Sequence, residues 1–310
     1  MRYYFAPMEG LTDSIYRELH YQYFPGVDLY FMPFFSPSVH RALTKKEQRD
    51  LPPAGEVPAI PQLLTKNVED FLWAASLCRD LGYHQVDLNL GCPSGTVVAK
   101  GKGSGMLGDL DNLDAFLWEI FNKSPIPISI KTRLGLSEME EFPEILNIYN
   151  RYPIKELTVH PRLRSDFYKH PVRMEGFLYA LEHSSNPICY NGNLNSLQET
   201  EDFSHHFPQV ESVMLGRGLI GDPGMLEGSS PQILEQFFAE LLERYTESFG
   251  SSRNAMFHLK ENWRYLLCHF DGSEKLGKKL RKTTDLQEYR SITHEIFTTL
   301  PFRSSLQPDW

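Results

Sequence analysis

The chain has 310 residues, of which 41% are hydrophobic and 23% charged, and its formal net charge at pH 7 is −9. This composition is typical of a soluble globular protein with one large core, and two domains of equal size are not expected. The acidic balance argues against indiscriminate binding of nucleic acid, although it is compatible with a local basic face. The apolar runs are too short to span a bilayer.

The N-terminus and the cysteines indicate the compartment. The first residues run directly into Pro7 without an apolar stretch of signal-peptide length, so we expect a cytoplasmic protein. The cysteines are far apart and form no CxxC pair; they are Cys78, Cys92, Cys189 and Cys268. We therefore expect neither disulfides nor a metal site.

Eight short apolar runs, each followed by room for a helix, divide the first three quarters of the chain. Repeated strand and helix units of this kind favour a parallel sheet. The predicted strands begin near residues 3, 28, 59, 86, 127, 156, 187 and 211, and the predicted helices span 14–23, 67–81, 110–121, 138–149, 172–181 and 197–203. Eight units favour an α/β fold of the (β/α)8 or TIM-barrel type, with a doubly wound open sheet as the alternative.

After Pro231 the strand pattern ends and only helical periodicity remains. The predicted helices there span 233–245, 256–270, 274–280 and 286–297. We therefore expect a barrel domain over residues 1–235 and a small all-helical domain over residues 236–310.

Residues 86–95 (VDLNLGCPSG) carry the most informative chemistry in the barrel. The apolar strand ends at Gly91, and the turn places Asn89 and Cys92 at the strand end. An unperturbed thiol, with a pKa of about 8.5, is mostly protonated at neutral pH. Cys92 is therefore a candidate general acid, although a cysteine is more often a small buried hydrophobe. Residues 100–105 (KGKGSG) are predicted to form a flexible basic loop that closes over a bound molecule.

Polar residues also follow the other strands, at the end where barrels of this type carry their working residues. They are Pro7, Met8, Gln62, Lys131, Arg133, His160, Arg162, Asn191, Gly192, Asn193, Gly216 and Arg217. The small residues after the last two strands, together with Arg217, predict a phosphate site. With Lys131 as a cation and amides beside a flat ring, the set favours flavin mononucleotide (FMN). A Rossmann dinucleotide site is not supported, because no GxGxxG follows a strand.

Several segments, in order along the chain, resemble the tRNA-dihydrouridine synthases. They are residues 6–13 (APMEGLTD), 87–93 (DLNLGCP), 131–135 (KTRLG), 160–162 (HPR), 190–192 (YNG) and 214–218 (MLGRG). The DLNLGCP segment is the most specific, and residues 257–263 (FHLKENW) are similar to the start of that family's C-terminal helical domain. The resemblance covers nearly the whole chain.

This resemblance implies a flavin-dependent reduction of the C5–C6 bond of a specific uridine in tRNA, with NADPH reducing the FMN. Cys92 would donate the proton to C5 after hydride reaches C6. The flavin would lie among Pro7, Met8, Gln62, Asn89, Lys131, His160, Asn191, Gly192, Asn193, Gly216 and Arg217. The substrate would be contacted by Arg133, Arg162 and Lys100.

The chain departs from the family pattern after His160. Members often have His-Gly-Arg-Thr followed by Tyr-x-Gly, whereas this chain has HPRL at 160–163 and YKH at 168–170. The difference falls in the loop expected to face the base, and it leaves the implied reaction unchanged.

The C-terminal segment 251–290 has nine basic and five acidic residues, which is a net charge of +4 in an otherwise acidic chain. In residues 275–282 (KLGKKLRK) basic residues are interleaved with leucines, which predicts a helix with one packed face and one face toward phosphates. The predicted tRNA contacts there are Lys278, Lys279, Arg281 and Lys282, and a merely solvated face is the alternative.

We expect a monomer that acts on tRNA. Two rival functions remain: a flavin barrel that acts on a free pyrimidine, and an RNA-binding protein without catalysis.

Overall fold

The computed structural model describes residues 1–37, 40–303, 305, 306 and 308. Nine strands form one sheet in the order β3-β2-β1-β9-β8-β7-β6-β5-β4, and the registered pairs are parallel. The strands are β1 (Arg2–Phe5), β2 (Leu29–Phe31), β3 (Ala59–Ile60), β4 (Gln62–Leu63), β5 (Val86–Leu90), β6 (Ile128–Gly135), β7 (Leu157–Leu163), β8 (Ile188–Tyr190) and β9 (Ser212–Leu215).

The sheet closes through Pro61, which separates β3 from β4. These two strands lie at opposite ends of the strand order, so one continuous segment, 59–63, pairs with β2 on one side and β5 on the other. Proline has no N–H to donate and interrupts the ladder, which divides the single predicted strand into two. The predicted (β/α)8 barrel is therefore confirmed, and the open doubly wound sheet is wrong.

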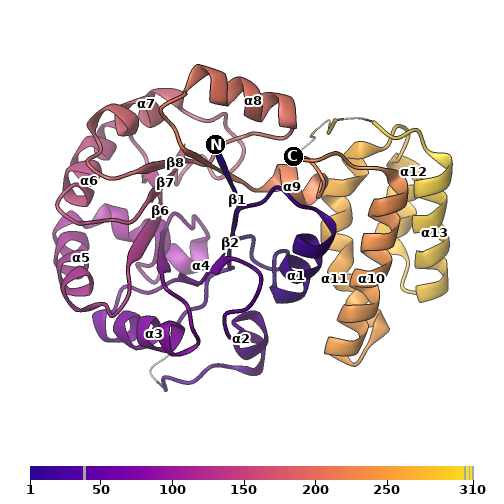
Figure 1. Cartoon of the computed structure of the whole chain (residues 1–310), viewed down its shortest axis with the longest axis horizontal. Helices are drawn as coiled ribbons and strands as arrows, with labels where there is room; N and C mark the ends of the chain where they lie inside the picture. The colour runs from indigo at the N-terminus through magenta and orange to yellow at the C-terminus, as the bar shows by residue number, and fades with distance from the viewer. Residues whose placement is uncertain (38–39, 304, 307, 309–310) are drawn as a thin grey trace. The chain divides into compact units, whose positions relative to one another are not determined.

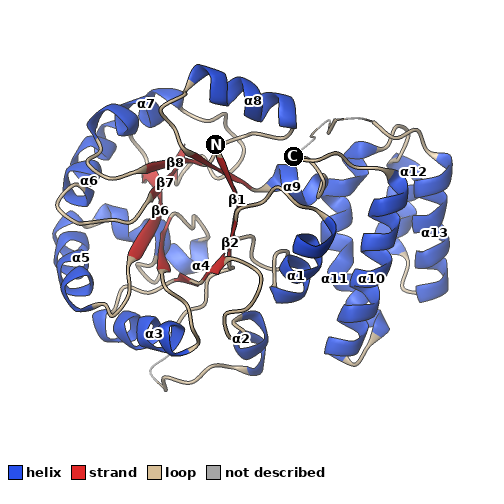
Figure 2. Ribbon diagram, viewed as in Figure 1, coloured by secondary structure: helices blue, strands red, loops and turns tan. Residues whose placement is uncertain are grey.

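Helices α3 (Val68–Asp80), α5 (Leu110–Lys123), α6 (Phe142–Tyr149) and α7 (Met174–His183) lie outside these strands (Figure 1). Figure 2 shows the strands as the inner layer. Helix α3 buries Phe71, Ala74, Ala75 and Cys78, which are three or four residues apart, and so presents one apolar face to the sheet. The Asn67 side chain caps this helix by accepting from the N–H of Asp70.

The chain divides into two compact units. The first comprises residues 1–7, 28–192 and 208–214, and the second comprises residues 8–27, 193–207 and 215–310. The second unit contains α1 (Ser14–Tyr23), α8 (Leu197–His206), α9 (Arg217–Gly221), α10 (Pro231–Phe249), α11 (Ser252–Leu266), α12 (Glu274–Lys282) and α13 (Leu286–Thr299). The helices expected after Pro231 are therefore present, and the domain boundary at residues 235 and 236 stays a prediction.

The second unit has its own aromatic core. Trp263 is fully buried, its ring lies 5.3 Å from that of Phe238, and its indole N–H donates to the Tyr289 hydroxyl at 2.8 Å. Asp13 caps α1 and accepts from the Tyr245 hydroxyl of α10 at 2.7 Å. Burial of large aromatic side chains with their polar atoms satisfied holds these helices together.

Three short helices are missing from the sequence prediction: α2 (Lys45–Asp50), α4 (Gly95–Val98) and η1 (Gly103–Gly108). Two further short helices, η2 (Met139–Glu141) and η3 (Leu267–His269), fall within the predicted helices 138–149 and 256–270 and have 3₁₀ geometry. Strands β6 and β7 extend past their predicted ends, so that Arg133 lies opposite His160 in the sheet. No helix in the described part of the chain combines the length and apolar character needed to cross a membrane.

Candidate functional site

The turn that carries Cys92 is held by a chain of buried amides at the C-terminal ends of β4 and β5. The Asn89 side-chain oxygen accepts the N–H groups of Gly91 and Cys92 at 3.1 and 2.9 Å. Its amide nitrogen donates to Gln62 at 2.8 Å, and Gln62 donates to Asp87 at 2.7 Å. Asn89 therefore fixes the turn, and both its side-chain oxygen and its side-chain nitrogen form hydrogen bonds within the chain.

Cys92 differs from the other cysteines in its exposure. Cys78, Cys189 and Cys268 are buried, and burial raises the pKa of the Cys78 thiol to about 12, whereas Cys92 is partly exposed. The Cys92 carbonyl accepts from both the hydroxyl and the N–H of Ser104, at 2.8 and 3.2 Å. A thiol on a fixed, partly exposed turn meets the geometric requirement for a general acid.

The contacts of Ser104 also correct the prediction for residues 100–105. Ser104 is fully buried in η1. Gly103 has φ +58°, and a Cβ added to it would lie only 3.0 Å from the Cys92 carbonyl oxygen. The second half of this segment is thus packed under the Cys92 turn, and the prediction of a loop free to close is wrong there. Lys100, in its first half, is exposed.

Lys131, on β6, brings a half-buried positive charge to the same end of the barrel. Burial, and then the neighbouring Arg133 charge, lower the pKa of its ammonium group to about 8, while the Asp87 carboxylate opposes this shift. Burial likewise raises the pKa of Asp87 to about 6, against hydrogen bonds from Gln62 and Ser129. No hydrogen bond within the described residues involves the Lys131 ammonium group. A ligand acceptor placed there would form a charge-assisted hydrogen bond.

His160 is fixed as a neutral imidazole by its two partners. The Arg162 guanidinium lies 2.8 Å from Nε2, and a guanidinium only donates, so Nε2 accepts and the ring proton is on Nδ1. Nδ1 faces the side-chain oxygen of Asn191 at 3.2 Å, and the Asn191 amide nitrogen donates to the Met214 carbonyl at 2.7 Å. Burial and the charges of Lys131, Arg133 and Arg162 lower the His160 pKa well below its usual value. His160 therefore has no proton to release from an imidazolium at neutral pH.

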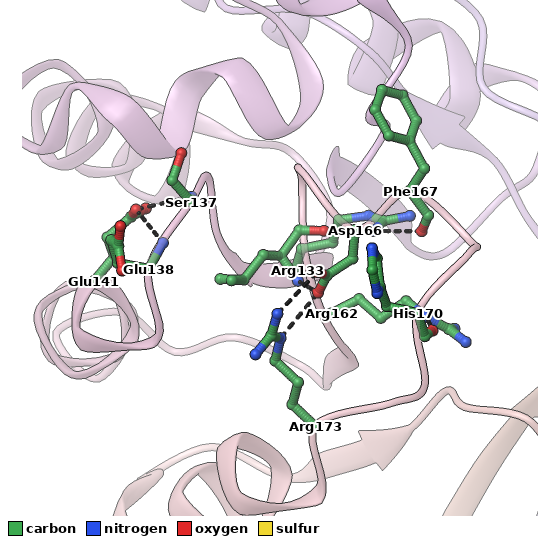
Figure 3. Close-up of polar contacts among 10 residues, drawn as sticks. Arg133, Ser137, Glu138, Glu141, Arg162, Asp166, Phe167, His170 and Arg173 are labelled. Carbon is green, nitrogen blue, oxygen red and sulfur yellow. Dashed lines mark hydrogen bonds and ion pairs between the residues drawn. The ribbon is translucent and has the colours of Figure 1, made fainter.

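The arginines near the C-terminal ends of β6 and β7 donate to backbone carbonyls within the chain (Figure 3). Arg133 is fully buried and donates to the carbonyls of Gly91, Leu163 and Phe167, each at 2.9 Å. Arg162, also buried, donates to the His170 carbonyl at 2.7 Å. Both were predicted as substrate contacts, and the structure shows that they also hold the loops around the site.

An ion pair in the loop after β7 was not foreseen from the sequence. Asp166 is buried and accepts two hydrogen bonds from Arg173, both at 2.9 Å, and a third from the N–H of Leu163 at 2.8 Å. These partners, the Arg173 side chain first, lower the pKa of the carboxyl. Asp166 and Arg173 are seven positions apart in a segment without periodicity. The only sign of the ion pair in the sequence is the presence of one acidic and one basic residue.

A second acidic side chain closes the loop after β6. Glu141 accepts the N–H groups of Leu136, Ser137 and Glu138 at 2.6, 2.9 and 2.8 Å (Figure 3). A carboxylate that binds three successive amides fixes the path of the chain immediately beyond Gly135.

The remaining predicted residues are divided between the two units. Pro7 and Gly192 belong to the first unit, and Met8, Asn193, Gly216 and Arg217 belong to the second. Within the second unit, Arg217 donates to the side-chain oxygen of Asn193 at 3.0 Å, and Gly216 caps α9. The predicted phosphate-binding residues Asn193 and Arg217 are thus in contact.

Helix α12 has the predicted two faces. Leu276, Gly277 and Leu280 are buried, whereas the four residues predicted to contact tRNA are exposed; these are Lys278, Lys279, Arg281 and Lys282. The described part of the chain contains no group of His, Cys, Asp or Glu side chains that could hold a metal ion.

The structure thus has a partly exposed thiol and a half-buried cation at the strand ends of a (β/α)8 barrel. Two solved structures share the fold: a morphinone reductase mutant in complex with tetrahydroNAD (12% identity, TM-score 0.52, 73% of this chain and 85% of that chain) and 2-naphthoyl-CoA reductase in complex with 2-naphthoyl-CoA (11%, 0.56, 73% and 49%).

The sequence profile of the family described as dihydrouridine synthase (Dus) matches residues 4–296. This chain therefore belongs to the dihydrouridine synthase family, whose members are flavin-dependent oxidoreductases.

Curated relatives extend this finding. A probable tRNA-dihydrouridine synthase of Rhizobium leguminosarum bv. phaseoli is 27% identical over 88% of this chain and 88% of its own. One from Staphylococcus aureus (strain COL) is 24% identical over 94% and 91%. The tRNA-dihydrouridine synthase B of Pasteurella multocida (strain Pm70) is 27% identical over 72% and 67%.

Proposed function

We propose that this protein reduces the C5–C6 double bond of a specific uridine in tRNA to give dihydrouridine, with FMN as its bound cofactor and NADPH as the reductant. The observation that carries the proposal is the partly exposed Cys92 thiol, held on a fixed turn near the half-buried Lys131 ammonium group. We place the protein in the cytoplasm and propose that it acts as a monomer, with residues 1–235 catalytic and residues 236–310 binding tRNA.

The residues present fit FMN. Lys131 is a half-buried cation without a hydrogen-bond partner in the described chain, and the carbonyl groups of a flavin ring would supply an acceptor. Gln62 and Asn89, hydrogen-bonded to each other, would line the ring. Pro7, Met8, His160, Asn191 and Gly192 would complete the surroundings of the ring, and Asn193, Gly216 and Arg217 would hold the phosphate. When bound and reduced, the flavin supplies hydride.

Cys92 is proposed as the proton donor. Addition of hydride at C6 of uracil gives enolate character, and C5 must then receive a proton from a neutral acid above the ring. The hydrogen bonds of Asn89 and Ser104 hold the Cys92 backbone in one place, so the main chain that carries the thiol is preorganised. The neutral His160 cannot take over this role as an imidazolium.

The basic residues of α12 support a macromolecular substrate. A uridine in folded tRNA must leave its stack to reach a barrel site, at a cost of a few kcal/mol. The basic face of α12 provides contacts to phosphates that a free pyrimidine does not have. Lys100, Arg133 and Arg162 are proposed to contact the target nucleotide. The basic face of α12 disfavours the free-pyrimidine rival, and the intact Cys92 turn disfavours an RNA-binding protein without catalysis.

The test is the dihydrouridine content of individual tRNA positions, measured by mass spectrometry in cells that lack the gene. We expect dihydrouridine to disappear at one position and to return with the intact protein but not with Cys92→Ala. If a strain without other synthases shows no change at any position, the tRNA assignment is wrong and free pyrimidines or other RNAs become the candidate substrates.

A further inference from the structure

The loop after β7 exposes two aromatic side chains in succession. Phe167 is 39% exposed and Tyr168 is 52% exposed, although the residues that hold the loop are buried. We propose that Phe167 and Tyr168 form a stacking platform for an unpaired nucleobase of the RNA that flanks the reacting uridine. This inference deepens the proposed function and rests on it, because it names the part of the RNA substrate that the loop receives.

The platform is rigid on its protein side. Asp166 anchors it through Arg173 and the N–H of Leu163, and the Phe167 carbonyl accepts from Arg133. Figure 3 shows the Phe167 ring pointing away from this cluster, while its carbonyl points into it. Because the backbone that carries the rings is already held in place, a base that stacks there orders little of the main chain.

The backbone at Phe167 is strained. Its φ is +49°, a left-handed conformation that in the described residues only one other non-glycine residue, Arg41, adopts. Bulky side chains disfavour this conformation, and Gly or Asn would occupy it at lower cost. Observed strain of this kind points to a functional use of the side chain.

Each ring of the platform is accompanied by a guanidinium group. The Arg164 Cζ atom lies 5.6 Å from the centroid of the Phe167 ring, and the Arg133 Cζ atom lies 5.1 Å from that of Tyr168. Aromatic rings combined with arginines are the common means by which proteins hold single-stranded RNA, because every base offers a π face and every nucleotide a phosphate. This combination favours a nucleotide over an apolar peptide as the occupant.

Arg133 places the platform beside the reactive turn. One guanidinium group donates both to the Gly91 carbonyl, directly before Cys92, and to the Phe167 carbonyl. The Tyr168 ring also lies 6.0 Å from that of His160. A base stacked on this loop is therefore a near neighbour of the base that faces Cys92.

The test uses the full-length flavoprotein and three variants: Phe167→Gly, Tyr168→Ala and Phe167→Trp. Trp118→Ala is the matched control, since Trp118 is a 57% exposed aromatic on α5. In Phe167→Gly and Tyr168→Ala we expect the KM for tRNA to rise by about 5- to 150-fold. The rate of flavin reduction by NADPH should be unchanged. Phe167→Trp should retain tight binding.

Two further readouts separate stacking from a structural role. Phe167→Gly relieves the strained φ, so its thermal unfolding midpoint should stay the same or rise while tRNA binding weakens. A tRNA with 2-aminopurine beside the target uridine should lose fluorescence on binding to the intact protein and keep it with Tyr168→Ala. A KM equal to that of the intact protein in both variants, or a loss of flavin reduction parallel to the loss of binding, would overturn the platform.

The outcome also distinguishes this inference from the proposed function. If the intact protein forms dihydrouridine and both variants bind tRNA normally, the platform alone is wrong. If the intact protein quenches 2-aminopurine and the variants do not, but no dihydrouridine forms, the platform stands and the reaction is wrong.

Discussion

The Cys92 turn and helix α12 hold their polar groups in different ways. At the turn, Asn89, Gln62 and Asp87 are buried and hydrogen-bonded to one another. On α12, the side chains of Lys278 and Lys282 are exposed, and no ion pair in the described chain involves them. The first region fixes the backbone of Cys92 through several hydrogen bonds, and the second offers several charges at the ends of flexible side chains.

This difference has an energetic meaning. Buried charges sit in a medium of low dielectric constant, where small displacements change energies and pKa values, as at Lys131 and Asp87. Exposed lysines remain hydrated and gain affinity for nucleic acid mainly by releasing counterions, so salt weakens their contribution. Substitutions at the turn should therefore change chemistry and cofactor binding, and substitutions on α12 should change affinity for RNA alone.

The largest effect is expected for Cys92→Ala. Loss of a positioned general acid should lower the rate of dihydrouridine formation by about 100- to 10,000-fold. The FMN content, measured by absorbance, should be unchanged, because Asn89 still holds the turn. Cys78→Ala is the control, since it removes a buried thiol on α3. A rate within a factor of ten of the intact protein would show that another group donates the proton.

Lys131→Met should weaken FMN binding by about 10- to 100-fold, the usual effect of losing a hydrogen bond from a charged group. The pKa of Lys131 is about 8, so FMN affinity of the intact protein should fall as the pH rises through about 8, and that of the variant should not. Fluorescence titration at several pH values measures both.

Lys131→Met should stabilise the flavin-free protein against unfolding, although it weakens the binding of FMN. Because the folded-state pKa of Lys131 lies below its unfolded value, the half-buried ammonium group lowers stability below pH 8, and this penalty fades as the pH rises toward the unfolded value. Lys131→Met should therefore raise the unfolding midpoint of the flavin-free protein at pH 7. A lower midpoint together with unchanged FMN affinity would contradict the role given to Lys131.

A smaller and different effect is expected on α12. Changing Lys278, Lys279, Arg281 and Lys282 to Gln should weaken tRNA binding by about tenfold and reduce the slope of log affinity against log salt by up to about 3, since each phosphate contact contributes about 0.7 to 0.9. FMN content should not change. The control is Lys45→Gln with Lys46→Gln, which removes two exposed charges from α2. An unchanged slope would leave α12 as a solvated face.

The strands of the barrel were predictable because parallel strands buried on both faces are continuous apolar runs with polar residues at one end. Strand β5 and its Asn89 and Cys92 are the clearest case. The division of segment 59–63 at Pro61 was not foreseen, although proline cannot complete a ladder. The short helix η1 was also missed, because residues 103–108 are rich in glycine and gain their order from the Cys92 turn.

The use of Arg133 could not be predicted from the sequence at all. Its acceptors are main-chain carbonyls of Gly91, Leu163 and Phe167, which any residue type would provide. The spacing of a motif identifies an arginine at a strand end, but only the folded loops determine whether its donors face a ligand or the backbone. The same holds for Asp166, whose partner Arg173 lies beyond an irregular segment.

Asp166→Asn should give the smallest effect, and it tests whether the order of the Cys92 turn extends to the base-facing loop. The pKa of Asp166 is lowered by Arg173, so the stability from this pair is present above the usual aspartate pKa and is lost as the pH falls through the lowered value. At pH 7 the substitution keeps an acceptor for the Leu163 N–H but removes the charge that binds Arg173. We expect a loss of about 1–2 kcal/mol in the free energy of unfolding.

The matched control for that change is Asp80→Asn. Asp80 pairs with Arg79 at 2.8 Å, but both side chains are more than half exposed, and such a pair contributes about 0–1 kcal/mol. Denaturant unfolding at pH 7 should therefore separate the two substitutions. If both cost the same, Asp166 behaves as a surface ion pair, and the loop that presents Phe167 is not built with the rigidity of the Cys92 turn. If only Asp166→Asn is destabilising, the hydrogen-bonded construction extends from the reactive thiol to the loop proposed to hold the neighbouring base.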